Sequence, residues 1–138
     1  RYCGDLAYAA AVATGADLVI TSETGYSLDE VINTLELKDI KTKHGRAEDL
    51  ARDKKYREKY DLSVSRAVAN LSTLSEYCLP FVKVGGTFIS MKSAESNEEI
   101  SEGKKAIGIL GGNIKEDIVF DLVENMPRRI IMIKKKWL

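Results

Sequence analysis

The chain has 138 residues, of which 44% are hydrophobic and 30% are charged, proportions that are ordinary for a folded globular protein. Lys and Arg together number 21, as do Asp and Glu, so the net charge does not indicate binding to a nucleic acid or a membrane. No apolar run reaches the ~20 residues that cross a bilayer, and no signal peptide is evident. These totals exclude a membrane-spanning protein and predict a cytoplasmic one without a membrane partner.

Residue types that commonly carry chemistry are sparse. The chain has two cysteines, Cys3 and Cys78, and one histidine, His44. The spacing of Leu74, Cys78 and Phe81 fits one buried face of a helix, so Cys78 is interpreted as a core residue. Neither a metal-ligand spacing nor a Ser–His–Asp or Cys–His pairing is evident, so we expect no metal and assign no catalytic residue.

The first part of the chain predicts a helix, a strand and a second helix. Residues 5–14 are rich in alanine, which favours a helix, and Gly15 stands where a C-terminal cap belongs. Residues 17–21 form a short run with β-branched side chains, which predicts a buried strand. Ser27, with Glu30 three residues later, is typical of the capping box that begins a helix.

The remainder alternates between strand-like and helix-like runs. The expected elements are a strand at 40–44, a helix at 47–59, a strand at 62–65, a helix at 70–82, a strand at 87–91, a helix at 97–110 and two final strands at 114–122 and 129–134. Gly85 and Gly86 are predicted to turn the chain into the strand at 87–91. Alternating strands and helices indicate parallel pairing. We therefore predict one α/β domain over residues 1–138, with three layers, a mostly parallel sheet and a C-terminal antiparallel hairpin.

Small, acidic or basic residues follow the first three predicted strands. Ser22 and Glu23 follow the first, Ala47 and Glu48 lie just past the second, and Arg66 ends the third. Because ligands of open α/β sheets bind outside the carboxyl ends of the strands, these positions outline a candidate nucleoside site. Glu48 can equally be an acidic residue at the start of a helix, where the helix dipole favours a negative charge. Arg66 fits a cation that meets an anion or a carboxylate at the end of a buried strand.

The C-terminal end of the chain is locally basic. The residues concerned are Arg128, Arg129, Lys134, Lys135 and Lys136. Such a group suits either contact with RNA phosphates or a solvated edge that prevents strand pairing. Both interpretations stay open.

Five segments together resemble the RsmG (GidB) family. They are residues 31–40, 44–50, 60–69, 79–86 and 129–134, and the resemblance spans about residues 29–137. Members of this family are bacterial 16S ribosomal RNA methyltransferases that form 7-methylguanosine with S-adenosylmethionine. The resemblance implies a Rossmann-like methyltransferase sheet, S-adenosylmethionine as cofactor, and the 16S rRNA of the small ribosomal subunit as partner. It also implies that Ala47 and Glu48 lie at the adenine end of the cofactor and that Arg66 faces the cofactor site.

The sequence also departs from the family pattern. The family's first strand and its glycine-rich loop of the type Gly-x-Gly-x-Gly-Phe-Pro-Gly have no counterpart, and residues 1–28 do not match. We interpret residues 1–28 as a foreign segment joined to an RsmG-like remainder, that is, a chimeric or rearranged chain. Three functions follow: a methyltransferase, a catalytically inactive scaffold, and an RNA-binding module. Because the backbone amides of such a loop hold the cofactor, we expect this chain alone to bind S-adenosylmethionine weakly.

Overall fold

The computed structural model describes residues 36, 38–41, 43–66 and 69–137. The chain divides into two compact units, residues 1–44 and residues 45–138, and each is taken by itself. The helices and the strand expected before residue 36 lie outside the described residues, as do Ser22 and Glu23. No strand forms at the described residues of 40–44, so that prediction is wrong. The expectation of one domain over residues 1–138 stays a prediction.

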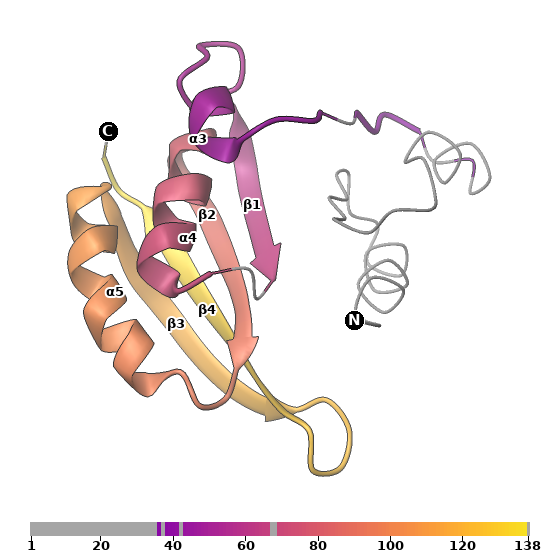
Figure 1. The fold of residues 1–138 in the computed structure, drawn as a ribbon, viewed down its shortest axis with the longest axis vertical. Helices are drawn as coiled ribbons and strands as arrows, with labels where there is room; N and C mark the ends of the chain where they lie inside the picture. Colours follow the sequence, from indigo (N-terminus) through magenta and orange to yellow (C-terminus); the bar gives the residue numbers. More distant parts are fainter. Residues whose placement is uncertain (1–35, 37, 42, 67–68, 138) are drawn as a thin grey trace. The chain divides into compact units, whose positions relative to one another are not determined.

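The described residues of the second unit form a four-stranded mixed sheet with helices on one face (Figure 1). The elements are α3 (Ala47–Leu50), β1 (Tyr60–Arg66), α4 (Leu71–Cys78), η1 (Leu79–Phe81), β2 (Val82–Ser93), α5 (Asn97–Ile109), β3 (Gly112–Asp121) and β4 (Pro127–Lys135). The strand order is β1-β2-β4-β3, in which β1 and β2 are parallel and β4 is antiparallel to both of its neighbours. The α/β class and the C-terminal hairpin are confirmed. Antiparallel pairing nevertheless predominates among the described strands, because the short β3–β4 connection returns the chain between β2 and β3.

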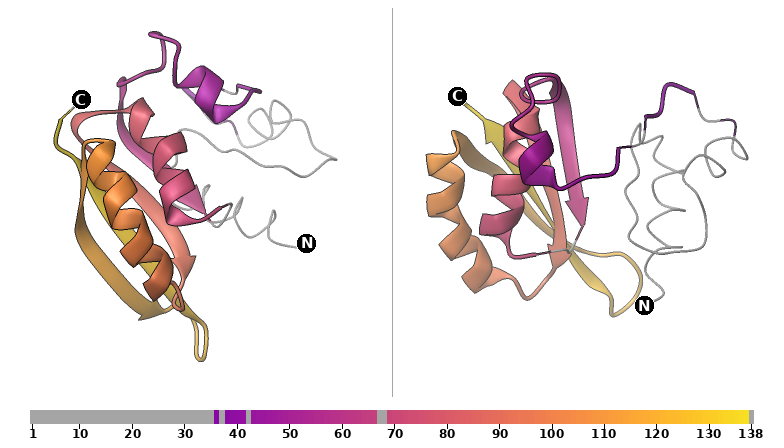
Figure 2. Two further views of the ribbon diagram at one scale, coloured as in Figure 1. Left: turned by 60° about the vertical axis from the view of Figure 1, so that its left-hand side comes forward. Right: turned by 45° about the horizontal axis from the view of Figure 1, so that its top comes forward.

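The two longer helices, α4 and α5, lie side by side on one face of the sheet (Figure 2). The side chain of Asn70 caps α4 by accepting a hydrogen bond from the amide of Thr73 at 2.9 Å. The helix gives way to the 3₁₀ turn η1 at Pro80, which has no amide hydrogen to continue it. Gly103 lets α5 approach α4 closely, since a Cβ there would lie 3.0 Å from the side chain of Leu71. Both predicted helices are confirmed, and α4 is shorter than expected.

The interior lies between these helices and the sheet. Its buried side chains are Leu71, Leu74, Leu79, Val82, Phe88, Ile100, Ile107, Ile131 and Ile133. Cys78 packs against this group, and burial raises the pKa of its thiol. The interpretation of Cys78 as a core residue is therefore confirmed.

The opposite face of the sheet carries no helix among the described residues, so these residues form two layers and not the three predicted. Alternation sends Leu62 and Val64 of β1, Met91 of β2 and Ile118 of β3 to this side, and all four are exposed. We call this surface the open face. Ile130 and Met132 of β4 pair with residues of this side and are partly buried, so its apolar side chains extend across all four strands.

The predicted helix at 47–59 is wrong beyond its first turn. α3 has four residues, and turns follow it up to the start of β1. The carboxylate of Asp53 accepts a hydrogen bond from the amide of Lys55 at 2.8 Å, which favours a turn over a helix. Glu58 adopts a left-handed φ of 55°, and its amide donates to the carbonyl of Pro80 at 2.9 Å. Tertiary hydrogen bonding to η1 therefore overrides the local helical pattern.

Gly85 and Gly86 lie inside β2 and do not precede it, so the predicted turn is wrong. The pairing register between β1 and β2 shifts opposite them, between Tyr60 and Leu62. A Cβ at Gly86 would lie 2.7 Å from the carbonyl oxygen of Asp61. The glycine pair therefore serves a strand irregularity at which the two backbones approach closely.

A buried arginine connects β4 to β3 and to the start of α5. Arg129 is 8% exposed, and its guanidinium donates two hydrogen bonds to Asp117, at 2.6 and 2.5 Å. It also donates to the side chain of Asn97 at 2.7 Å and to the carbonyl of Ala94 at 3.3 Å. The paired hydrogen bonds stabilise the carboxylate and lower the pKa of Asp117. Arg129 therefore holds β3, β4 and the start of α5 together.

Arg129→Met should lower the free energy of unfolding by about 1–3 kcal/mol, because it removes the hydrogen bonds of a buried guanidinium to Asp117, Asn97 and Ala94. Arg128→Met is the matched control, since Arg128 is the adjacent residue and donates to the neighbouring carbonyl of Pro127. We expect the control to change stability by less than about 0.5 kcal/mol. Urea denaturation measures the free energy of unfolding of both variants. Equal values would contradict the role of Arg129 in holding these elements together.

The same pair predicts a loss of stability in acid. Because folding lowers the pKa of Asp117, its contribution is present above the unfolded pKa of about 3.9 and is lost as the pH falls through the lower folded pKa. Asp117→Asn should therefore be less stable at neutral pH, and its Tm should fall less than that of the parent between about pH 5 and pH 2. Asp121→Asn, an exposed carboxylate of the same strand, is the control. If Asp117→Asn and the parent lost Tm equally, another group would be responsible.

Candidate functional site

The carboxyl ends of the parallel strands β1 and β2 lie side by side. Arg66 is the last residue of β1, pairs in register with Met91 of β2, and is exposed. It therefore stands at the edge where open α/β sheets bind ligands. No carboxylate among the described residues forms an ion pair with it, so its charge is available to an anion.

A buried lysine organises the same edge. Lys92 follows Met91, is 9% exposed and forms an ion pair with Glu99 of α5 at 2.5 Å. Its ammonium group also donates to the carbonyl of Ala69, in the segment between Arg66 and α4. Lys92 thus joins this segment to β2 and α5. Sequence reasoning missed it, although a lysine near the end of an apolar strand was an available signal.

The described residues do not bring Ala47 and Glu48 together with Arg66. Ala47 and Glu48 begin α3, which packs against α4 beside the first half of β1, whereas Arg66 ends that strand (Figure 1). Glu48 pairs with Arg46 at 2.8 Å, and hydrogen bonds from its own amide and from Arg46 lower its pKa. This environment agrees with the interpretation of Glu48 as a helix-start acid. That Ala47, Glu48 and Arg66 all border one cofactor site stays a prediction.

For S-adenosylmethionine, the described residues fit only in part. Arg66 offers a cation at the correct edge, but Ala47 and Glu48 lie away from it. The sequence has no glycine-rich loop whose amides could approach the methionine moiety. Among themselves, these residues therefore do not form a nucleoside pocket.

The described part of the chain shows neither a metal site nor a membrane-spanning helix. No group of three or more His, Cys, Asp and Glu side chains in this part is arranged to hold a metal ion. None of the helices described there has the length and apolar character needed to cross a bilayer.

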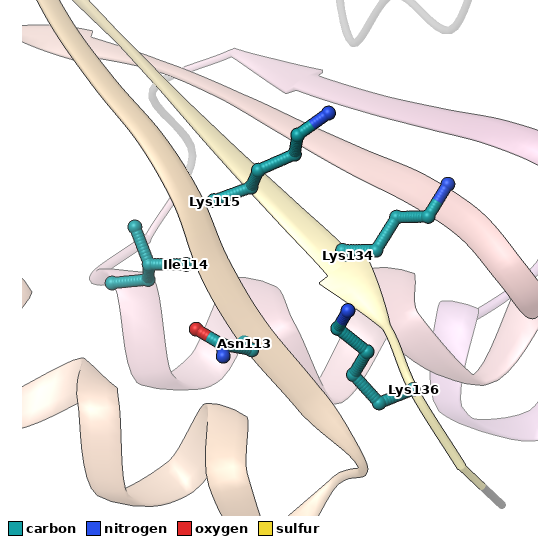
Figure 3. A pocket seen from close by; sticks show the side chains of 5 residues that line it. All are labelled: Asn113, Ile114, Lys115, Lys134 and Lys136. Atoms are coloured by element: carbon teal, nitrogen blue, oxygen red, sulfur yellow. The ribbon is translucent and has the colours of Figure 1, made fainter.

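A hollow on the β3–β4 hairpin is lined by five residues, three of which are lysines (Figure 3). Its volume is about 230 Å³, and its lining residues are Asn113, Ile114, Lys115, Lys134 and Lys136. Lys134 pairs in register with Thr87 near the middle of β2, whereas Arg66 pairs with Met91 near its end. The lysine hollow is therefore separate from the edge that carries Arg66.

Two of the five residues that the sequence assigned to a basic C-terminal surface are buried, so the prediction is wrong for them. Arg129 is buried against Asp117, as described above. Lys135 is 3% exposed and bonds to Glu58 at 2.8 Å and to the carbonyl of Leu79 at 3.2 Å. Strict alternation along β4 turns both inward and leaves Lys134 on the other side. The expectation also missed Lys115.

The fold defined by these elements is that of α/β methyltransferases. A candidate methyltransferase from Thermoplasma acidophilum is similar, with a TM-score of 0.63 and 12% identity, covering 96% of this chain and 64% of that one. M. jannaschii TYW2, solved in complex with AdoMet, has a TM-score of 0.53 at 14% identity, and the match covers 77% of this chain and 49% of the TYW2 chain. An rRNA methylase from Streptococcus thermophilus has a TM-score of 0.52 at 15% identity, covering 87% and 72%. At these identities the similarity shows the fold alone.

Sequence relatives give the family. The model of the GidB family, rRNA small subunit methyltransferase G, matches residues 26–130, and the chain belongs to this family. The ribosomal RNA small subunit methyltransferase G of Acetivibrio thermocellus is 57% identical over 109 residues, covering 78% of this chain and 45% of the relative. That of Clostridium tetani is 51% identical, covering 78% and 46%. The chain thus spans about half the length of these relatives, and a foreign origin of residues 1–28 is not confirmed.

The Lys92 contact predicts a local effect at the candidate site. Lys92→Met should lower stability by about 2–4 kcal/mol and should speed amide exchange in the segment from Ala69 to Leu74, where the cap of α4 is formed. Lys135→Met is a matched control, because Lys135 is also a buried lysine bonded to one glutamate and one carbonyl. Lys135→Met should lower the free energy of unfolding by a similar amount, but it should not selectively speed amide exchange between Ala69 and Leu74. Identical exchange patterns in the two variants would contradict a local role for Lys92.

Proposed function

We propose that the chain belongs to an S-adenosylmethionine-dependent methyltransferase that acts on N7 of a guanine in 16S rRNA of the small ribosomal subunit. The observation that carries this proposal is the family match over residues 26–130. The parallel pair β1–β2 supports it, because Arg66 at its carboxyl edge forms no ion pair with any residue that the structure describes. A ribosomal RNA substrate also favours a cytoplasmic location.

The chemistry of this reaction suits the residues present. N7 of guanine is already nucleophilic, so methyl transfer needs positioning more than acid–base catalysis. A chain with one histidine and no evident catalytic dyad is compatible with that demand. Arg66 would contribute by holding an anionic group at the edge of the sheet, and Lys92 by fixing the segment beside it.

An inactive scaffold is the alternative. The separation of Glu48 from Arg66 among the described residues favours it. This separation bears on cofactor binding and leaves the fold unaffected. Cofactor binding and turnover therefore discriminate between the two functions.

Isothermal calorimetry with S-adenosylmethionine should show weak or absent binding by this chain. Each lost hydrogen bond of a loop costs about 1 kcal/mol or more, so several would move a micromolar dissociation constant towards millimolar values. If binding is measurable, Arg66→Ala should weaken it without unfolding the protein, because Arg66 is exposed. Arg52→Ala, another exposed arginine, is the control. Tight binding that survives Arg66→Ala would place the cofactor elsewhere.

Transfer of a labelled methyl group to 30S particles and to isolated small-subunit RNA tests the reaction itself. The scaffold alternative gives only background incorporation, whereas the methyltransferase gives label at a guanine N7. Label at another atom would contradict the proposed specificity.

A further inference from the structure

We infer that the lysine hollow, formed by Lys115, Lys134 and Lys136 around Asn113, binds backbone phosphates of RNA. This inference deepens the proposed function, since it names the surface of the chain that contacts the RNA substrate.

A strand irregularity places Lys115. Regular pairing joins Asn113 to Lys134, but the register shifts between Ile114 and Glu116, so that Lys115 is an extra residue in β3. Such bulges redirect a side chain. Figure 3 shows the side chains of Lys115 and Lys134 extending in the same direction. The bulge therefore adds a cation beside the one that β4 already presents.

Backbone contacts fix the other two lysines. Lys134 lies in β4 between Thr87 of β2 and Asn113 of β3. Lys136 follows two residues later, and its amide donates to the carbonyl of Gly111 at 2.7 Å. Residues two apart in an extended chain share one side, so both side chains line the same hollow, although they extend in different directions (Figure 3).

The lysines of this hollow have no ion-pair partner among the residues that the structure describes. Within the described residues, Lys92, Lys135 and Arg129 each pair with a carboxylate, whereas Lys115, Lys134 and Lys136 form no ion pair. Glu116, the nearest acid along β3, is not among the residues that line the hollow. Three neighbouring cations repel one another, and a bound anion relieves that repulsion.

The size of the hollow selects the kind of anion. About 230 Å³ is below the range of about 300–1,000 Å³ that is usual for pockets holding whole small molecules. The hollow suits a phosphate group whose remaining atoms lie outside it. A polyanionic backbone supplies such groups in a row, and Lys134 lies four residues along β2 from the register position of Arg66, which is roughly 13 Å. RNA bound here would run beside the proposed reaction edge.

Salt-dependent binding of a fluorescein-labelled single-stranded RNA, without cofactor, tests the inference. The triple variant Lys115→Gln, Lys134→Gln and Lys136→Gln should reduce the slope of log K against log salt by about 2, since each phosphate contact contributes about 0.7. The control triple variant carries glutamine at Lys54, Lys104 and Lys105, three exposed lysines outside the hollow. It removes the same charge and should leave the slope unchanged.

Two outcomes would overturn the inference. One is an equal loss of slope in both triple variants, which would mean that net charge alone governs binding. The other is displacement of RNA by inorganic phosphate far beyond the effect of chloride at equal ionic strength, which would make the hollow a site for free anions. Because the measurement requires no methyl transfer, a selective loss of slope would support the RNA surface whether or not this chain transfers a methyl group.

Discussion

Alternation of side chains along β4 governs both the interior and the exterior of this unit. The inward residues are Arg129, Ile131, Ile133 and Lys135, so two isoleucines complete the core and a neutralised cation closes it at each end. The outward set includes Lys134, which has no such partner among the described residues. A one-residue slip of β4 would exchange the two sets and place isoleucines in water. The core and the lysine hollow are therefore specified by the same register.

Buried cations recur at the points where elements must be joined. Arg129 connects the hairpin to the start of α5. Lys135 bonds to Glu58 in the turns before β1, and Lys92 bonds to Ala69 in the segment after β1. Each replaces hydration with a carboxylate and at least one carbonyl, which is the arrangement that makes a buried charge tolerable. Apolar contacts alone are less directional, so these polar contacts define where the loops begin.

The elements that could be predicted from the sequence were those whose local signals agree with their packing. α5, with acids in its first turn, and the two strands of the hairpin are examples. The predictions at 47–59 and at Gly85–Gly86 failed because distant backbone groups, of η1 and of Asp61, decide those conformations. At the site, the position of Arg66 was predictable as the end of a strand. Lys115 was not predictable, since a bulge is a tertiary property. For Lys92 the sequence offers a lysine near the end of an apolar strand, but its burial and its partners depend on tertiary packing.

The open face has a thermodynamic consequence. Leu62, Val64, Met91 and Ile118 are already in contact with water when residues 45–138 are folded. Unfolding this unit therefore exposes less additional apolar surface than unfolding a sheet covered on both sides. The heat-capacity change, ordinarily about 12–15 cal/mol/K per residue, should be correspondingly small. The curve of unfolding free energy against temperature is then broad and shallow, and the unit changes little in stability between cold and warm conditions.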